Sequence, residues 1–242
     1  MKREYHKWFS PQLKKDMELL VFGHAGAPVL FFPTRTARFY DYENWKIIAS
    51  LVDKIESGYL QIYCVDSNDL ESFYSTCVHP SQRILRHLDY EAYILKEVVP
   101  LVYYQNTNRF LIAAGCSLGA YHAMNIALRH PHLFSKVVCL SGRYDLTIGT
   151  HDFCNLFEGY SDENVYMNMP THYMPNLNDP VLLDQIRRME IIMAVGKMDP
   201  FLPNNTLLHE ILQDKQINSR LDVWEGEAHR SRYWRQMVRC YL

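Results

Sequence analysis

The chain has 242 residues, of which 48% are hydrophobic and 21% charged, which is enough apolar material for one globular domain with a sizeable core. Its 25 basic and 27 acidic residues give a formal net charge of −2, so neither nucleic acid nor an anionic membrane surface is expected as a partner. No run of residues approaches the roughly 18 apolar positions that a membrane-spanning helix needs.

The N-terminus and the cysteines indicate where the protein works. Basic residues follow Met1 without an apolar stretch behind them, so we expect no secretory signal and a cytoplasmic protein. The six cysteines form neither a CxxC pair nor a spacing typical of metal ligands. We therefore expect reduced thiols and no metal site.

The first half of the chain alternates short apolar runs with amphipathic stretches. The two opening strands should be antiparallel, because so few residues join them. A break is expected near Pro100, since proline disrupts a helix. The predicted elements are strand 17–22, a turn at 23–28, strand 29–32, helix 44–57, strand 59–65 and a helical region over 80–104.

The second half continues the alternation, apart from one stretch rich in Asn, Tyr, Met and Pro. We interpret that stretch as an irregular helical insertion over one edge of the sheet. The predicted elements are strand 109–114, helix 117–129, strand 137–140, the insertion at 145–188, strand 191–195, helix 203–214, strand 220–224 and helix 231–242.

Strands that alternate with helices indicate an α/β fold with a mostly parallel central sheet of about eight strands and helices on both faces. Such a sheet is the middle layer of a three-layer sandwich. No repeat, linker or low-complexity tract marks a boundary, so we expect a single domain over 1–242 that includes the insertion.

The pentapeptide Gly115-Cys116-Ser117-Leu118-Gly119 has the form G-x-S-x-G and stands between a predicted buried strand and a predicted helix, which is the context this motif requires. A serine in such a turn has a strained backbone, and glycine on either side avoids a clash with neighbouring main chain. The hydroxyl then projects from the carboxyl edge of the sheet, where α/β folds bind ligands. We predict Ser117 as a nucleophile; an incidental serine in a glycine-flanked turn is the alternative.

A serine hydroxyl needs a base, and in this type of site the base follows the acid along the chain. Only His209 and His229 come after both this strand-to-helix turn at Ser117, called the nucleophile elbow, and strand 191–195. His209 falls inside a predicted helix, whereas His229 lies on the loop after the last strand. We therefore predict His229 as the base, the alternative being a solvated surface histidine.

The acid should follow a strand end between serine and histidine. Asp199 comes directly after strand 191–195 and is the predicted third member, which would orient the imidazole. Asp145, after strand 137–140, is the second candidate. Glu225 and Glu227 are disfavoured because they lie too close to the histidine in sequence.

An acyl-transfer site also needs about two N–H donors for an oxyanion. We predict the backbone N–H of Leu118, directly after the nucleophile, and that of Arg35 on the loop after strand 29–32. Pro33 has no N–H, which leaves Thr34 as the other donor on this loop. Thr34, Asp66 and Tyr74 follow predicted strands and are expected to line the substrate pocket.

The chain resembles the esterases of the α/β-hydrolase superfamily, the group with esterase D-like, feruloyl and acetyl-xylan-type enzymes. The elbow is shared with the whole superfamily. Other matching stretches begin at Pro28, Tyr63, Ser141 and Gly196, and read PVLFFPT, YCVD, SGRYD and GKMD. Of these, the Phe-Pro-Thr and Ser-Gly-Arg-Tyr-Asp stretches are more particular to this group.

The resemblance implies metal-independent, cofactor-free ester hydrolysis through an acyl-enzyme, with Ser117, Asp199 and His229 as the triad. One departure stands out. The loop after Phe-Pro-Thr usually carries small residues, whereas this chain has Arg35 and Arg38, which would either clamp an acidic substrate or narrow the oxyanion hole.

We predict a serine-dependent carboxylic-ester hydrolase acting on a small-molecule ester, with an acylated sugar as one candidate. An acyltransferase with the same triad is one alternative, and a weakly catalytic or non-catalytic binding protein on the same fold is another. The oligomeric state is left open, a homo-oligomer included.

Overall fold

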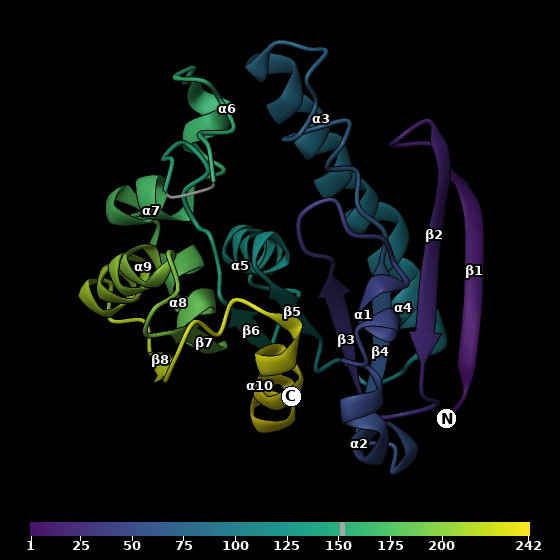
Figure 1. Cartoon of the computed structure of the whole chain (residues 1–242). Coiled ribbons are helices and arrows are strands. Elements are labelled where there is room, and N and C mark those ends of the chain that lie inside the picture. The colour runs from purple at the N-terminus through teal and green to yellow at the C-terminus, as the bar shows by residue number, and fades with distance from the viewer. Residues whose placement is uncertain (151–152) are drawn as a thin grey trace.

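The computed structural model describes residues 1–150 and 153–242, and its centre is one eight-stranded sheet. The strand order is β1-β2-β4-β3-β5-β6-β7-β8, and Figure 1 shows the sheet crossing the molecule between β1 at one side and β8 at the other. The strands are β1 Arg3–Ser10, β2 Lys15–Phe22, β3 Ala27–Phe32, β4 Leu60–Val65, β5 Ile112–Cys116, β6 Lys136–Leu140, β7 Glu190–Gly196 and β8 Ser219–Trp224.

The sheet is parallel from β4 onward, and only its first edge is antiparallel. β2 pairs antiparallel with both β1 and β4, whereas β4, β3, β5, β6, β7 and β8 pair in parallel. The predicted mostly parallel sheet of about eight strands is confirmed. β3 does run opposite to β2, as expected, but β4 lies between them, so the two strands are not hydrogen-bonded neighbours.

Helices cover both faces, which makes the three-layer sandwich. One face packs on α3 Pro80–Tyr93, α4 Val99–Gln105, α5 Leu118–Arg129, α8 Pro180–Arg187 and α9 Leu202–Asp214. The other face packs on the segment with α1 Asp41–Asn44, η1 Ala49–Leu51 and α2 Val52–Glu56, and on α10 Ser231–Tyr241. Because every central strand is buried on both faces, these strands are nearly continuous apolar runs.

Two predicted helices differ in detail. The stretch 44–57 is not one helix, because Lys46 has φ 58° and interrupts it between α1 and η1. The region 80–104 does not break at Pro100. It continues through a π-helical turn, η2 Ile94–Val98, directly before α4, which accommodates a proline that cannot donate a backbone hydrogen bond.

The predicted insertion contains four short helical elements, which are α6 Glu163–Tyr166, α7 Pro170–Tyr173, η3 Met174–Asn176 and α8. Apolar side chains from its first part, up to Met169, form a separate small core against Phe73, Leu118 and Tyr121, whereas those of η3 and α8 belong to the main core. Since this core joins the insertion to the start of α5, we propose that sheet and insertion form one domain.

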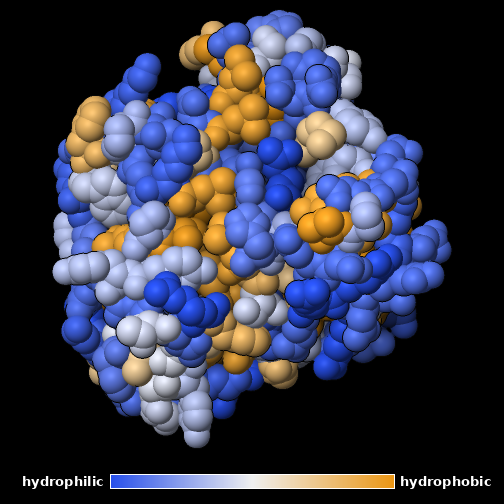
Figure 2. Space-filling model, turned by 180° about the vertical axis from the view of Figure 1, so that it is seen from behind, coloured by the Kyte–Doolittle hydropathy of each residue, from blue (hydrophilic) through white to orange (hydrophobic). Residues whose placement is uncertain are grey.

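The surface has both hydrophobic and hydrophilic regions (Figure 2), and the cysteines of the described chain form no disulfide. Seen from behind, hydrophobic residues form patches that hydrophilic residues interrupt (Figure 2). All six cysteines are free, and Cys64, Cys116 and Cys139 are buried. Within the described ranges, none of the helices has both the length and the apolar character to cross a membrane.

Candidate active site

Ser117 joins β5 to α5 in a conformation that few residues adopt. Its backbone has φ 57° and ψ −119°. A Cβ on Gly115 would lie 2.2 Å from the main chain of Gly119, and a Cβ on Gly119 would lie 2.2 Å from the carbonyl oxygen of Phe32. Only glycine fits at both positions, so this pentapeptide can form a turn tight enough to project the serine.

The three predicted side chains form one hydrogen-bonded chain. Nε2 of His229 lies 3.1 Å from Oγ of Ser117, and Nδ1 lies 3.0 Å from Oδ2 of Asp199. The carboxylate is inaccessible to solvent, whereas the imidazole is 17% exposed. A buried carboxylate can thus hold one ring nitrogen protonated and leave the other free to accept the serine proton.

The loops that carry the acid and the base are bonded to each other. Met198 donates its N–H to the carbonyl oxygen of Gly226 at 3.0 Å. A Cβ on Gly196 would lie 2.6 Å from both the side chain of Ala228 and the carbonyl oxygen of Glu227, so the loops approach as closely as glycine allows. This contact fixes the position of Asp199 relative to His229.

The carboxylate of Asp199 has a second partner, a backbone N–H, and aromatic rings surround the base. Oδ1 of Asp199 accepts the N–H of Phe201 at 2.9 Å, which holds the carboxylate in one orientation. The rings of Phe153, Phe201 and Trp234 have centroids 5.4–5.7 Å from that of His229. The imidazole therefore has little freedom to leave its position.

The second candidates for acid and base lie elsewhere. Asp145 pairs with Nε2 of His172 at 2.8 Å, and the pKa of Asp145 is lowered, because its bonds to His172 and Thr147 outweigh the effect of burial. His209 bonds to the hydroxyl of Ser219. The glutamates of the final loop, Glu225 and Glu227, pair with Lys197 and Arg230.

The predicted oxyanion donors lie on two segments that touch. Leu118 is the first residue of α5, and Arg35 belongs to the loop that follows β3. Neither backbone N–H has an acceptor among the residues that the structure describes. The close approach of Gly119 to the carbonyl oxygens of Phe32 and Pro33 brings the two segments together.

A family model described as "Putative esterase" matches residues 36–238, well over half of the chain. The chain belongs to this esterase family. Membership makes the protein a carboxylic ester hydrolase. A search of curated proteins finds no match for the esterase.

Solved structures share the fold of the esterase at low sequence identity. A ferulic acid esterase has a TM-score of 0.74 at 17% identity, with 99% of this chain and 96% of that chain covered. The serine hydrolase FphF of Staphylococcus aureus gives 0.72 at 14%, with 99% and 96% covered. An S-formylglutathione hydrolase from Agrobacterium tumefaciens gives 0.72 at 17%, with 98% and 91% covered. The α/β-hydrolase fold expected from the sequence is confirmed.

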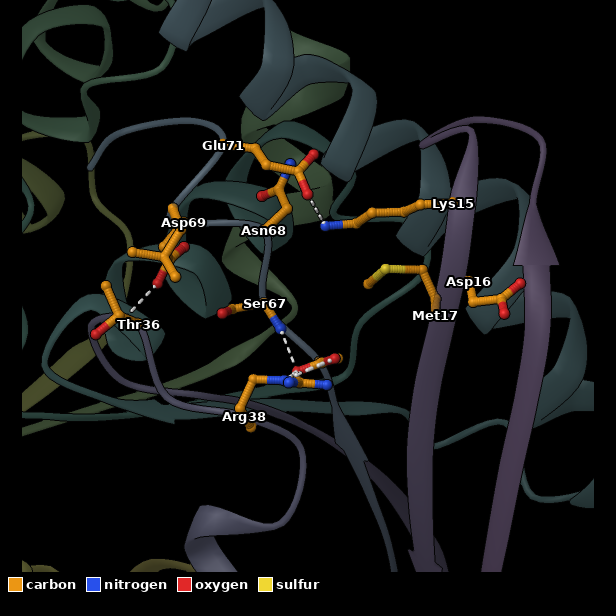
Figure 3. Close-up of a pocket in the computed structure, with 11 residues that line it drawn as sticks. Lys15, Asp16, Met17, Thr36, Arg38, Ser67, Asn68, Asp69 and Glu71 are labelled. Atoms are coloured by element: carbon orange, nitrogen blue, oxygen red, sulfur yellow. Dashed lines mark hydrogen bonds and ion pairs between the residues drawn. The ribbon is translucent and has the colours of Figure 1, made fainter. Parts of the chain in front are cut away.

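The three predicted pocket residues have different surroundings. Thr34 lines a groove of about 390 Å³ together with His229, Trp45 and Trp234. Asp66 lies in a separate polar cleft of about 210 Å³, shown in Figure 3. There Arg38 donates to both carboxylate oxygens of Asp66, at 2.8 and 3.1 Å, so the carboxylate holds the loop.

Burial raises the pKa of Asp66, although Arg38 and two backbone N–H groups act in the opposite direction. Tyr74 lies near the guanidinium of Arg35, whose carbon is 5.8 Å from the phenol ring centroid. Of the three side chains, Thr34 therefore lines the groove beside the base, Asp66 supports the loop, and Tyr74 flanks Arg35.

Sequence reasoning gave no specific role to Asp69, which is fully buried and bonds two parts of the site. Its Oδ2 accepts the backbone N–H of Thr36 at 2.9 Å (Figure 3), and its Oδ1 lies 3.4 Å from Nε2 of His122 on α5. Its place after a strand end was a usable signal. The segments that it joins are far apart in sequence, so its two partners were not predictable.

Proposed function

We propose that the esterase is a serine hydrolase that works through an acyl-enzyme, with Ser117 as nucleophile, His229 as base and Asp199 as the orienting acid. The observation that carries this proposal is the continuous hydrogen-bonded chain from Oγ to Oδ2, with contacts of 3.1 and 3.0 Å, at a strained elbow. Among the described residues, no other serine hydroxyl is hydrogen-bonded to a histidine that also bonds a buried carboxylate.

In the acylation step, Oγ of Ser117 attacks the ester carbonyl carbon while Nε2 of His229 takes the hydroxyl proton. The carbonyl oxygen becomes an oxyanion, and Asp199 stabilises the imidazolium. When the tetrahedral intermediate collapses, the bond to the alcohol oxygen breaks and His229 gives its proton to that oxygen. The acyl group is then esterified to Ser117.

In the deacylation step, a water molecule replaces the alcohol. Nε2 of His229 takes a proton from the water as its oxygen attacks the acyl carbon. Collapse of the second intermediate breaks the bond to Oγ, which recovers the proton from His229, and the carboxylic acid leaves. The same residues thus serve both steps, and a water molecule is consumed.

The oxyanion is assigned to the backbone N–H groups of Leu118 and Arg35. Two observations support this: both N–H groups lack an acceptor in the described part of the chain, and their segments touch at Gly119. The start of α5 adds the positive end of a helix dipole. Removing one such donor costs roughly 100- to 1,000-fold in rate.

A small-molecule ester is the substrate we propose, in a cytoplasmic setting. The ferulic acid esterase and the S-formylglutathione hydrolase among the solved structures show that this fold serves both oxygen and sulfur esters. An acylated sugar is one such ester, because the groove of about 390 Å³ beside His229 is lined by the partly exposed Trp45, which offers an apolar face for stacking.

Labelling with a fluorophosphonate probe tests this proposal, because the probe reacts only with a serine that a base activates. We expect the label on the peptide that contains Ser117, and no label in Ser117→Ala. Asp199→Asn should slow labelling by about 1,000-fold or more, since the amide favours the wrong imidazole tautomer.

Asp145→Asn is the matched control, because Asp145 bonds His172 and not His229. It should be labelled at the rate of the unaltered protein. Label on another serine, or equal labelling of the Asp199→Asn protein, would contradict the proposed triad.

A further inference from the structure

Arg35 places a positive charge next to the candidate active site. Its guanidinium carbon lies 5.8 Å from the ring centroid of Tyr74 and 5.6 Å from that of Phe153. The same Phe153 ring has its centroid 5.7 Å from that of His229. The Phe153 ring therefore lies close to both the guanidinium and the base.

The two arginines of this loop differ in how their charges are balanced. Arg38 donates to Asp66 and to Glu18, so two carboxylates neutralise it. Arg35 has no carboxylate oxygen within 4.0 Å among residues 1–150 and 153–242. The structure thus separates two residues that the sequence presented alike, and it leaves the charge of Arg35 facing solvent beside the site.

A second guanidinium, that of Arg143, lies near Tyr74 and over the ring of Phe201. Arg143 is only 3% exposed, and its Nη2 donates to the carbonyl oxygens of Ile148 and Cys154. Its Nε and Nη1 have no hydrogen-bond partner in the described part of the chain. Buried donors of this kind cost free energy unless a ligand or water satisfies them.

Tyr74 connects the two arginines. Burial raises the pKa of the Tyr74 phenol, and Arg143 and Arg35 both act against that rise, because each guanidinium favours the phenolate. Tyr74 is therefore close enough to both guanidinium groups for their charges to act on it, and its ring centroid lies 5.8 Å from the guanidinium carbon of Arg35. Asp145, the acidic neighbour of Arg143, is already bonded to His172.

We propose that the esterase prefers esters that carry a carboxylate on the acyl or the alcohol part, and that Arg35, supported by Arg143 and Tyr74, binds this carboxylate. A guanidinium matches a carboxylate with two parallel hydrogen bonds, and flanking rings hold it in place. The inference rests on the proposed function, since it names the substrate class of the same site.

Two pairs of esters test it by kcat/KM. One pair, the 4-nitrophenyl monoester of adipic acid and that of adipamic acid, carries the charge on the acyl side. The other, 4-acetoxybenzoate and 4-acetoxybenzamide, carries it on the alcohol side. For at least one pair we expect the charged ester to be favoured about tenfold, as one charge-assisted hydrogen bond provides.

The preference should disappear in Arg35→Met, which keeps the backbone N–H, and should reverse in Arg35→Glu. High salt should weaken it in the unaltered protein. Arg109→Met is the matched control, because Arg109 also stacks on a ring, that of Tyr103 at 4.4 Å. Arg109 lies before the start of β5, at the amino-terminal ends of the parallel strands, whereas Arg35 lies at their carboxyl ends. It should keep the preference.

Equal kcat/KM for charged and neutral esters in both pairs, or an unchanged preference in Arg35→Met, would overturn the inference and leave the proposed function standing. Turnover that persists in Ser117→Ala, or no turnover of any ester by the unaltered protein, would instead overturn the proposed function.

Discussion

At the scale of one residue, the backbone of Ser117 lowers the stability of the fold and at the same time positions the hydroxyl beside His229. A positive φ combined with ψ −119° is unfavourable for any residue with a Cβ, by about 1–3 kcal/mol. The fold tolerates this cost because Gly115 and Gly119 remove the clashes around it and because the N–H of Ser117 bonds the carbonyl oxygen of Leu140 at 2.8 Å. This backbone conformation places the hydroxyl 3.1 Å from Nε2 of His229.

This strain predicts a difference in stability between two variants that lack the hydroxyl. Ser117→Gly and Ser117→Ala both remove the hydroxyl, but only glycine relieves the backbone. We expect Ser117→Gly to be the more stable of the two by about 1 kcal/mol, net of the greater freedom of glycine in the unfolded chain. Denaturant unfolding of the two proteins measures it, and a less stable glycine variant would argue against a strained elbow.

At the scale of elements, Asp69 joins the loop after β3 to α5. The loop carries one proposed oxyanion donor and the helix begins with the other, so we expect the carboxylate to set the spacing between the two halves of the proposed hole. Thr36, whose N–H it accepts, has φ 55°, a further sign that the loop is held in a particular shape.

Asp69→Ala should therefore lower kcat by about tenfold or more with little change in KM. The reason is that displaced donors stabilise the oxyanion of the transition state less, while binding of the substrate in the ground state is unaffected. Asp69→Asn keeps an oxygen that accepts the N–H of Thr36, and it should recover most of the loss. Steady-state kinetics with one ester measures both. Equal activity of the two variants would show that this contact does not position the hole.

Glu91 joins α3 to the end of α5. It bonds Arg129 and His130, and although burial opposes the charge, these partners hold the pKa of Glu91 at about 2. A carboxyl whose pKa is lower in the folded state stabilises the protein above the unfolded pKa, near 4.3, and loses that effect as the pH falls toward 2.

The ion pairs of Glu91 thus predict a stability that declines on acidification from about pH 5 toward pH 2, by about 3 kcal/mol. Glu91→Gln should flatten this part of the profile and lower the stability at neutral pH. Glu190→Gln, which removes an exposed pair with Lys136, is the control and should change little. Unfolding free energies measured between pH 3 and pH 7 decide, and a parallel profile for Glu91→Gln would refute the assignment.

At the scale of the whole molecule, the alternation of apolar runs with amphipathic stretches was enough to predict the sheet and its two helical layers, and the G-x-S-x-G pentapeptide between strand and helix predicted the turn at Ser117. β1 was not predicted, because an exposed edge strand with alternating charged residues carries little apolar signal. The order of β2, β4 and β3 was also not predictable, since it depends on a crossover that no local pattern encodes.

The candidate site divides in the same way. Ser117, His229 and Asp199 follow strand ends in a fixed chain order, so local patterns were sufficient to select them. Asp69 and Phe153 act through partners distant in sequence, and only the folded chain brings those partners together. The different surroundings of Arg35 and Arg38 likewise required the structure.

The central claim is that an acyl group passes through Ser117, and rapid mixing with 4-nitrophenyl acetate tests it most directly. We predict a burst of nitrophenol that is stoichiometric with the protein, with acid-quenched samples carrying the acetyl group on the peptide of Ser117. Acetyl on any other residue, or a full burst from Ser117→Ala, would contradict the account.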